Sequence, residues 1–184
     1  WVDMSAGTCE TRELPHEWCL EHMGGKALAT KLLVEWDTTD YDQAVHQRHP
    51  VTGRMDSAAH STAPLLFMTG PYQGSKVGSS GRAVVVTRSP LTECYIDTYI
   101  GGNIGHDLRK AGWDGVFITG SSERWMRLEI DDQRAQLHPD DDLVGKTTWQ
   151  TEQALADLGE CLSIGPAGEN GVRIASPLTA GRRA

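Results

Sequence analysis

The sequence contains no close pair of cysteines. Its four cysteines, Cys9, Cys19, Cys94 and Cys161, are widely and irregularly spaced, and none forms a C-x-x-C motif. Zinc and iron–sulfur sites usually include at least one close pair, so we expect this chain to bind no metal through cysteine. The spacing favours four separate, mostly buried thiols in a reducing compartment, and therefore a cytoplasmic protein.

Long apolar runs and an excess of basic residues are also missing. No segment approaches the roughly 18 apolar residues that a membrane helix needs, and no basic-then-apolar signal peptide opens the chain. The formal net charge of -8 is opposite in sign to that of most nucleic-acid-binding proteins. With 184 residues, 39% hydrophobic and 23% charged, the composition is typical of a globular domain that binds neither membrane nor nucleic acid.

The residue patterns predict many short strands and a few helices. These follow neither a regular β-α-β order nor an all-β order, so we expect an α+β fold with mixed sheets. The polar segment 38–63, with His46 and His49, is interpreted as a long surface loop. Strands are expected within 1–4, 9–14, 65–69, 81–88, 113–120, 125–130, 133–138, 161–164 and 172–175, and helices at 17–23, 26–36, 104–111 and 148–158.

Three glycine-rich segments, at residues 70–82, 99–106 and 163–170, carry the chemistry. Glycine lets backbone N–H groups approach a ligand closely, and Arg82 offers a planar guanidinium to a phosphate or a heterocycle edge. The second segment precedes a predicted helix, an arrangement that suits an anion. The third predicts a tight turn in which Glu169 has a turn-fixing or capping role, with a role as a base as the alternative. Together they predict a loop site for an anionic, phosphorylated ligand. The sequence contains no recognisable catalytic triad or carboxylate pair from which a reaction could be inferred.

Five motifs occur in order along nearly the whole chain. They are Gly24-Gly25-Lys26-Ala27-Leu28-Ala29, then Gly70-Pro71 with Ser80-Gly81-Arg82 and Val85-Val86-Thr87-Arg88-Ser89-Pro90-Leu91-Thr92, then Gly101-Gly102 through Gly105 to Leu108-Arg109-Lys110-Ala111-Gly112-Trp113-Asp114-Gly115, then Thr148-Trp149 with Thr151-Glu152, and Ser163-Ile164-Gly165-Pro166-Ala167-Gly168-Glu169-Asn170. In order and approximate spacing they resemble the motifs of the N-terminal domain of the aldehyde ferredoxin oxidoreductase family.

This resemblance implies a fold and a cofactor. In the family, the N-terminal domain is a base of two β-sheets that bears tungsten or molybdenum held by two pyranopterins. We therefore expect residues 1–184 to be a pterin-cradling domain, truncated or split at both ends. The cysteines of a 4Fe-4S cluster and most of the substrate pocket then belong to further domains or to a partner chain.

The resemblance also implies roles for particular residues. Arg82 resembles the arginine that bridges pterin and cluster, and Gly101 resembles a pterin-contacting glycine. Tyr99 and Ala184 stand where two backbone carbonyls hold the magnesium that ties the pterin phosphates, and Arg183 resembles a phosphate-contacting arginine. The family usually has asparagine at the position of Tyr99, and a tyrosine needs more room.

The implied reaction is the oxidation of an aldehyde to a carboxylic acid, with electrons passed to ferredoxin or a similar carrier. Two alternatives stay open: an acyl-CoA (aromatic ring) reductase of the same superfamily, and a non-catalytic cofactor-binding scaffold subunit. Homo- and hetero-oligomeric assemblies are equally compatible with the sequence.

Overall fold

The computed structural model describes the backbone of residues 1–44, 63–92 and 94–179, and their side chains outside 37–44. The strands are β1 (Val2–Asp3), β2 (Thr8–Cys9), β3 (Leu65–Met68), β4 (Ala83–Arg88), β5 (Tyr95–Ile100), β6 (Gly115–Thr119), β7 (Met126–Ile130), β8 (Ala135–Pro139), β9 (Leu162–Ser163) and β10 (Leu178–Thr179). The helices are α1 (His16–His22), α2 (Gly25–Ala44), α4 (Ile104–Lys110), α5 (Thr148–Ala154) and α6 (Gly165–Glu169), with 3-10 turns η1 (Asp141–Leu143) and η2 (Ala156–Leu158). The predicted α+β class is confirmed.

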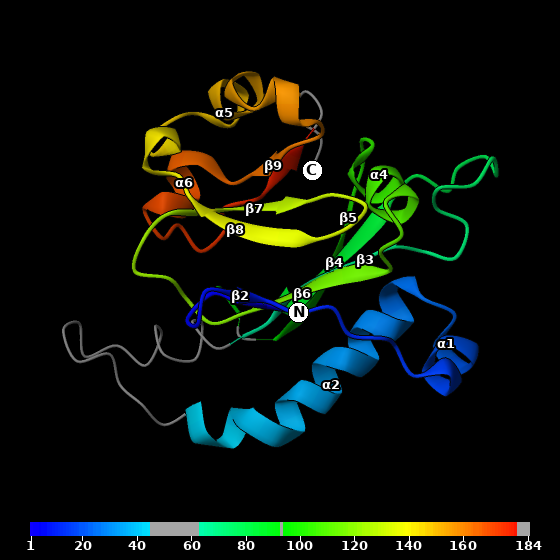
Figure 1. Ribbon diagram of the computed structural model, residues 1–184. Coiled ribbons are helices and arrows are strands. Elements are labelled where there is room, and N and C mark those ends of the chain that lie inside the picture. The colour runs from blue at the N-terminus through cyan, green and yellow to red at the C-terminus, as the bar shows by residue number, and fades with distance from the viewer. Residues whose placement is uncertain (45–62, 93, 180–184) are drawn as a thin grey trace.

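A mixed sheet in the order β2-β1-β6-β3-β4-β5 runs through the middle of the molecule (Figure 1). Within it, β1 and β6 are parallel and the other neighbouring strands are antiparallel. The hairpin β7–β8 and the pair β9–β10 are separate antiparallel ladders. The described strands therefore form one six-stranded mixed sheet and two small antiparallel ones, because β7 and β8 pair with each other and β9 pairs with the late strand β10.

The main core lies between α2 and one face of the six-stranded sheet. Buried α2 side chains recur at the spacing of one helix face. Fully burying each large aliphatic side chain contributes roughly 1.5–3 kcal/mol, so this contact fixes α2 on the sheet. The cluster consists of Leu28, Ala29, Leu32, Leu33, Leu66, Met68, Val84, Val86 and Phe117.

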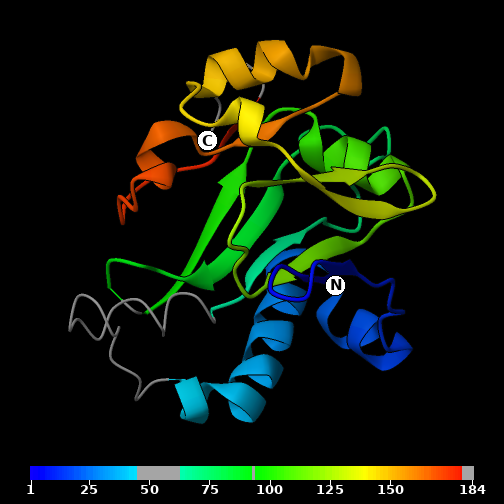
Figure 2. The ribbon, with the colours of Figure 1, turned by 60° about the vertical axis from the view of Figure 1, so that its left-hand side comes forward.

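The opposite face of the sheet carries the remaining elements. Figures 1 and 2 both show the β7–β8 hairpin, α5, α6 and the β9–β10 pair on the side away from α2. Among the described helices, none combines the length and the apolar character needed to cross a membrane.

Several local predictions are corrected by the structure. The helix expected at 26–36 continues as α2 to Ala44, so the first part of the loop expected at 38–63 is helical, and His46 and His49 lie outside the described residues. Residues 172–175 form no strand, and residues 165–169 form the short helix α6 where a tight turn was expected. The strand β5 was not predicted, although its alternating aromatic and β-branched residues are typical of a strand.

The cysteines are less buried than expected. Cys9, Cys19 and Cys161 are half-buried, and Cys94 is exposed. None of the four forms a disulfide. The expectation of mostly buried thiols is therefore wrong, because these residues lie at strand ends and on a short surface helix instead of in the core under α2.

Candidate cofactor site

Arg82 and Gly101 lie at the same end of the β4–β5 ladder. Ala83 of β4 is paired with Ile100 of β5, so Arg82 and Gly101 are the next residues beyond that pair on neighbouring strands. Arg82 is exposed, and its side chain has no hydrogen-bond or ion-pair partner among the described residues. The register thus places a guanidinium with open donors beside a glycine backbone that a ligand can approach closely.

The second glycine-rich segment is packed directly on the first. Gly102 has φ 74°, in the left-handed region that favours glycine, and the chain then enters α4. Gly105 is buried against the side chains of Gln73 and Ala83. Gln73 is 5% exposed, and its Oε1 accepts a hydrogen bond from the Gly70 N–H at 2.6 Å. Segments 70–82 and 99–106 therefore form one packed unit.

The start of α2 and the residues after α4 are tied to the same unit. The Gly25 N–H donates to the Thr69 carbonyl oxygen at 2.9 Å. The N–H and hydroxyl of Thr69 both donate to the Asp114 carbonyl oxygen, at 2.9 and 2.8 Å. The Asp114 carboxylate in turn pairs with Arg109 of α4. Three motifs that are far apart in the sequence thus meet at one end of the sheet.

The third glycine-rich segment lies in the layer above the sheet and has a structural role. The carboxylate of Glu169 accepts the Gly145 N–H through both oxygens, at 3.1 and 2.9 Å. Gly165 has φ 63° and packs beside Thr148 at the start of α5. Glu169 thus fixes the turn at Gly145, and not a turn within its own segment, where the chain forms α6.

A link between this upper layer and the second segment was missed in the sequence. Oε1 of Glu160 accepts hydrogen bonds from the Asn103 N–H at 3.2 Å and from the Thr179 hydroxyl at 3.0 Å. Glu160 belongs to no recognisable motif, and its partners lie 57 and 19 positions away. The sequence therefore carries no signal for this contact.

Tyr99 has room for its larger side chain. It is paired with Val84, whose side chain faces α2, so Tyr99 faces α2 as well and is 44% exposed. On the same face, Asp97 forms an ion pair with Lys26 at 2.8 Å, and this hydrogen bond is the main reason that the pKa of Lys26 is raised. The roles predicted for the Tyr99 carbonyl, and for Arg183 and Ala184, which lie outside the described residues, stay predictions.

The described residues of this site are better suited to donate hydrogen bonds to a bound molecule than to coordinate a metal ion directly. Within the described parts of the chain, no three His, Cys, Asp or Glu side chains gather where they would hold a metal ion. What gathers at the β4–β5 end is a guanidinium and glycine backbone. This donor set fits a large anionic heterocycle that brings its own metal ligands.

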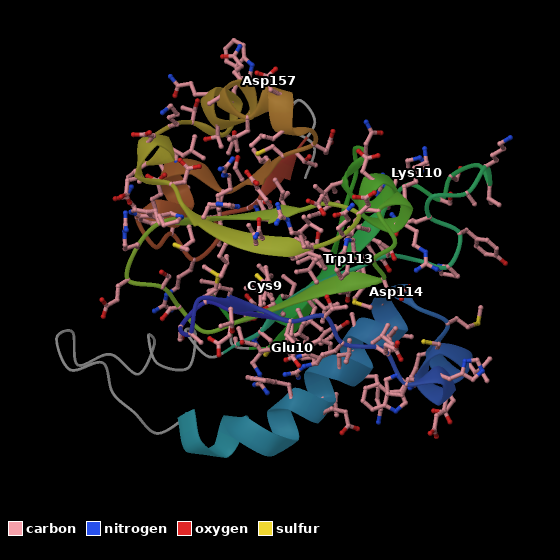
Figure 3. The ribbon with its side chains drawn as sticks, viewed as in Figure 1. Cys9, Glu10, Lys110, Trp113, Asp114 and Asp157 are labelled. Atoms are coloured by element: carbon pink, nitrogen blue, oxygen red, sulfur yellow. The ribbon has the colours of Figure 1, made fainter. Side chains whose placement is uncertain are left out.

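A cavity of about 130 Å³ lies elsewhere, between β2, the start of β6 and the β7–β8 hairpin. Cys9, Glu10 and Trp113, labelled in Figure 3, are among its lining residues. The Trp113 indole N–H donates to the Asp131 carbonyl oxygen at 2.6 Å and so ties the hairpin turn to this region. Ligand pockets usually measure about 300–1,000 Å³, so this cavity is too small for a pterin cofactor, and it contains no predicted site residue.

Fold and site together define an α+β scaffold domain that presents a cationic, glycine-lined sheet end. The model of the family "Aldehyde ferredoxin oxidoreductase, N-terminal domain" matches residues 1–184, and the chain belongs to this family.

Similar proteins support the family assignment, and each of them is much longer than this chain. It is 38% identical over 125 residues to a tungsten-containing aldehyde ferredoxin oxidoreductase of Pyrococcus abyssi, covering 65% of this chain and 21% of that protein. The protein of the same name from Thermococcus kodakarensis is 31% identical and matches 100% of this chain and 29% of its own length. The chain thus spans less than a third of these relatives.

A solved structure shows the same fold. The chain superimposes with a TM-score of 0.81 on the active site complex BamBC of benzoyl coenzyme A reductase in complex with 1,5-dienoyl-CoA. The match covers 100% of this chain and 26% of that chain, at 24% identity. At this identity, the similarity establishes the fold alone.

Proposed function

We propose that this chain is the N-terminal, cofactor-bearing part of a tungsten- or molybdenum-pterin oxidoreductase that oxidises aldehydes to carboxylic acids. The observation that carries the proposal is the position of Arg82, which has no partner among the described residues and lies beside Gly101 at one end of the β4–β5 ladder. Family membership and the tungsten-containing relatives support the same reading.

Each residue of the site has a definite task in this proposal. Arg82 would donate hydrogen bonds to the pterin and link it to the 4Fe-4S cluster, and Gly101 would let the backbone approach the pterin. The backbone carbonyls of Tyr99 and Ala184 would hold a magnesium ion of the cofactor, and Arg183 would bind a phosphate group. When bound, the metal–pterin cofactor supplies the two-electron oxidation in which water provides the product oxygen.

The rest of the active site comes from outside this chain. Further domains or a partner chain supply the cluster cysteines and the substrate pocket, and ferredoxin or a similar carrier accepts the electrons. The relatives, of which this chain covers less than a third, have ample length for such domains.

Elemental and pterin analysis of the natively purified assembly tests the proposal. We expect tungsten or molybdenum together with pterin at two molecules per metal atom, and iron in the same preparation. A folded and complete assembly that contains neither metal nor pterin would overturn the proposal.

The fold similarity to benzoyl coenzyme A reductase supports one second candidate, an acyl-CoA ring reductase. Substrate-dependent reduction of an electron-accepting dye distinguishes the two. Reduction of the dye when an aldehyde is added supports the main proposal. Reduction of the dye when a 1,5-dienoyl-CoA is added supports the alternative. An assembly that holds the cofactor but reacts with neither compound would favour a scaffold subunit.

A further inference from the structure

The strand β5 is one edge of the six-stranded sheet, and its outer side has no partner strand among the described residues. The Ser89 N–H donates to the Cys94 carbonyl oxygen at 2.8 Å, in register with the pairs of β4 and β5. Hydrogen-bonded and non-hydrogen-bonded pairs alternate in an antiparallel ladder, so Tyr95, Asp97 and Tyr99 belong to non-hydrogen-bonded pairs. The backbone N–H and C=O groups of these three residues therefore point away from β4, toward the open edge.

Contacts with α2 hold this edge in place. The Tyr95 and Thr30 hydroxyl oxygens lie 2.9 Å apart, at hydrogen-bonding distance. The Asp97 carboxylate forms its ion pair with Lys26 at 2.8 Å. The extended backbone at Tyr95 and Asp97 is thus fixed before any partner binds, so little free energy would be lost in ordering it.

The edge also lacks the features that usually keep an edge strand from pairing. Natural edge strands are protected by proline, by lysine or by a β-bulge. Residues 95–100 contain no proline, lysine or glycine, and they pair with β4 without a bulge. Asp97 is the single charged residue of β5, and Lys26 neutralises it. Nothing in this strand therefore opposes the addition of another strand.

The remaining part of the enzyme supplies the occupant. This chain spans less than a third of its tungsten-containing relatives, so most of such an enzyme lies outside residues 1–184. β5 ends directly before Gly101 of the candidate cofactor site, so protein that completes this site comes close to the edge. An extended segment can pair with an open edge through its backbone and needs no apolar pocket.

We propose that the edge of β5 at Tyr95 and Asp97 is an interaction surface for an extended segment of the enzyme from outside residues 1–184. The segment adds a strand to the sheet through the N–H and C=O groups of both residues. Tyr99, whose carbonyl oxygen is assigned to magnesium in the proposed function, is not part of this pairing. The pairing requires neither the cofactor nor the proposed reaction, so it holds or fails independently of both.

Hydrogen exchange at single-residue resolution in the natively purified assembly tests the pairing. The amides of Ile96 and Thr98 face β4 and serve as internal references. The Tyr95 and Asp97 amides should exchange within about tenfold of these references, because all four N–H groups are then hydrogen-bonded. Exchange at Tyr95 and Asp97 that exceeds the references by a larger factor would show an open edge and overturn the proposal.

Proline substitution gives a second test in the same assembly. Asp97→Pro removes an N–H that points to the edge, whereas Asp97→Ala keeps it. Both variants lose the ion pair with Lys26, so Asp97→Ala is the matched control. Proline is tolerated where the N–H of an edge strand faces solvent, so equal melting temperatures of the two variants would contradict the pairing. The expected result is a clearly lower melting temperature for Asp97→Pro.

A photoreactive amino acid in place of Ile96 identifies the occupant. Ile96 is 42% exposed and lies on the face of β5 opposite to α2, because Val86, the partner of Asp97, faces α2. Cross-links to a segment of the assembly outside residues 1–184 are expected. Cross-links confined to residues 1–184, of the same or of a second copy, would overturn the assigned occupant.

Discussion

Gln73 packs directly against Gly105, and this contact locks two glycine-rich segments together. An added Cβ at Gly105 would overlap Gln73 Nε2 and lie 2.7 Å from Ala83 Cβ. Gln73 is also held from the other side by the Gly70 N–H. The geometry of the proposed site therefore depends on the absence of a side chain at one helical position.

Gly105→Ala should therefore lower the free energy of unfolding by about 1–3 kcal/mol, because the overlap forces Gln73 or α4 to move. Gly78→Ala is the control, since an added Cβ there has no atom within 4 Å and should change stability by less than about 0.5 kcal/mol. Urea unfolding of both variants measures the difference. Equal stability of the two variants would show that Gly105 is not a tight contact.

Arg82→Ala and Arg82→Lys should both lower the pterin content of the purified assembly, alanine more than lysine, without a change in thermal stability. Lysine keeps the charge but not the planar set of donors. Arg124→Ala is the control, because Arg124 is an exposed arginine whose ion pair with Asp141 lies away from the site. Pterin analysis and thermal unfolding provide the measurements, and unchanged pterin in Arg82→Ala would refute the assigned role.

Asp131→Ala should lower the melting temperature at pH 7, and this difference should shrink as the pH falls below about 4. The N–H groups of Gln133 and Arg134 donate to Asp131 Oδ1 at 2.7 and 2.9 Å and hold the pKa of Asp131 below its usual value. A lowered pKa in the fold means that the stabilisation is present above the unfolded pKa and is lost as the pH falls through the folded one.

Thermal unfolding between pH 7 and pH 3 measures this dependence. Gln133→Ala, in the same turn, removes no titratable group and is the control. A constant difference between wild type and Asp131→Ala across the range would contradict the expected linkage.

Cys94 should react with iodoacetamide before Cys9 and Cys161. Cys94 is exposed, whereas burial raises the pKa of both other thiols, and for Cys161 the nearby carboxylates of Glu152 and Glu160 raise it further. A raised pKa leaves less thiolate near pH 8, so the difference in rate should narrow as the pH increases. Peptide mapping by mass spectrometry follows each site, and equal rates for Cys94 and Cys161 at pH 8 would count against this order.

Local patterns made much of the fold predictable. The apolar runs of β3 and β4 and the apolar spacing of α2 depend on neighbours a few residues away, so they are legible in the sequence. The strand β9 lies within the strand predicted at 161–164, whereas the two-residue strand β10 was not predicted, because it exists only where it pairs with β9. The glycine-rich segments and Arg82 could be identified from the sequence as candidates for contacts to the cofactor. Their positions relative to one another could not be predicted.

By itself, the sequence determined the α+β class, the family motifs and the residues that are candidates for cofactor contacts. Only the tertiary structure decided that Arg82 and Gly101 end neighbouring strands, that Gln73 fills the space at Gly105, and that Glu160 joins Asn103 to Thr179. The physical reason is range: strand and helix patterns arise from contacts between near neighbours, whereas these contacts join residues brought together by strand register and layer packing.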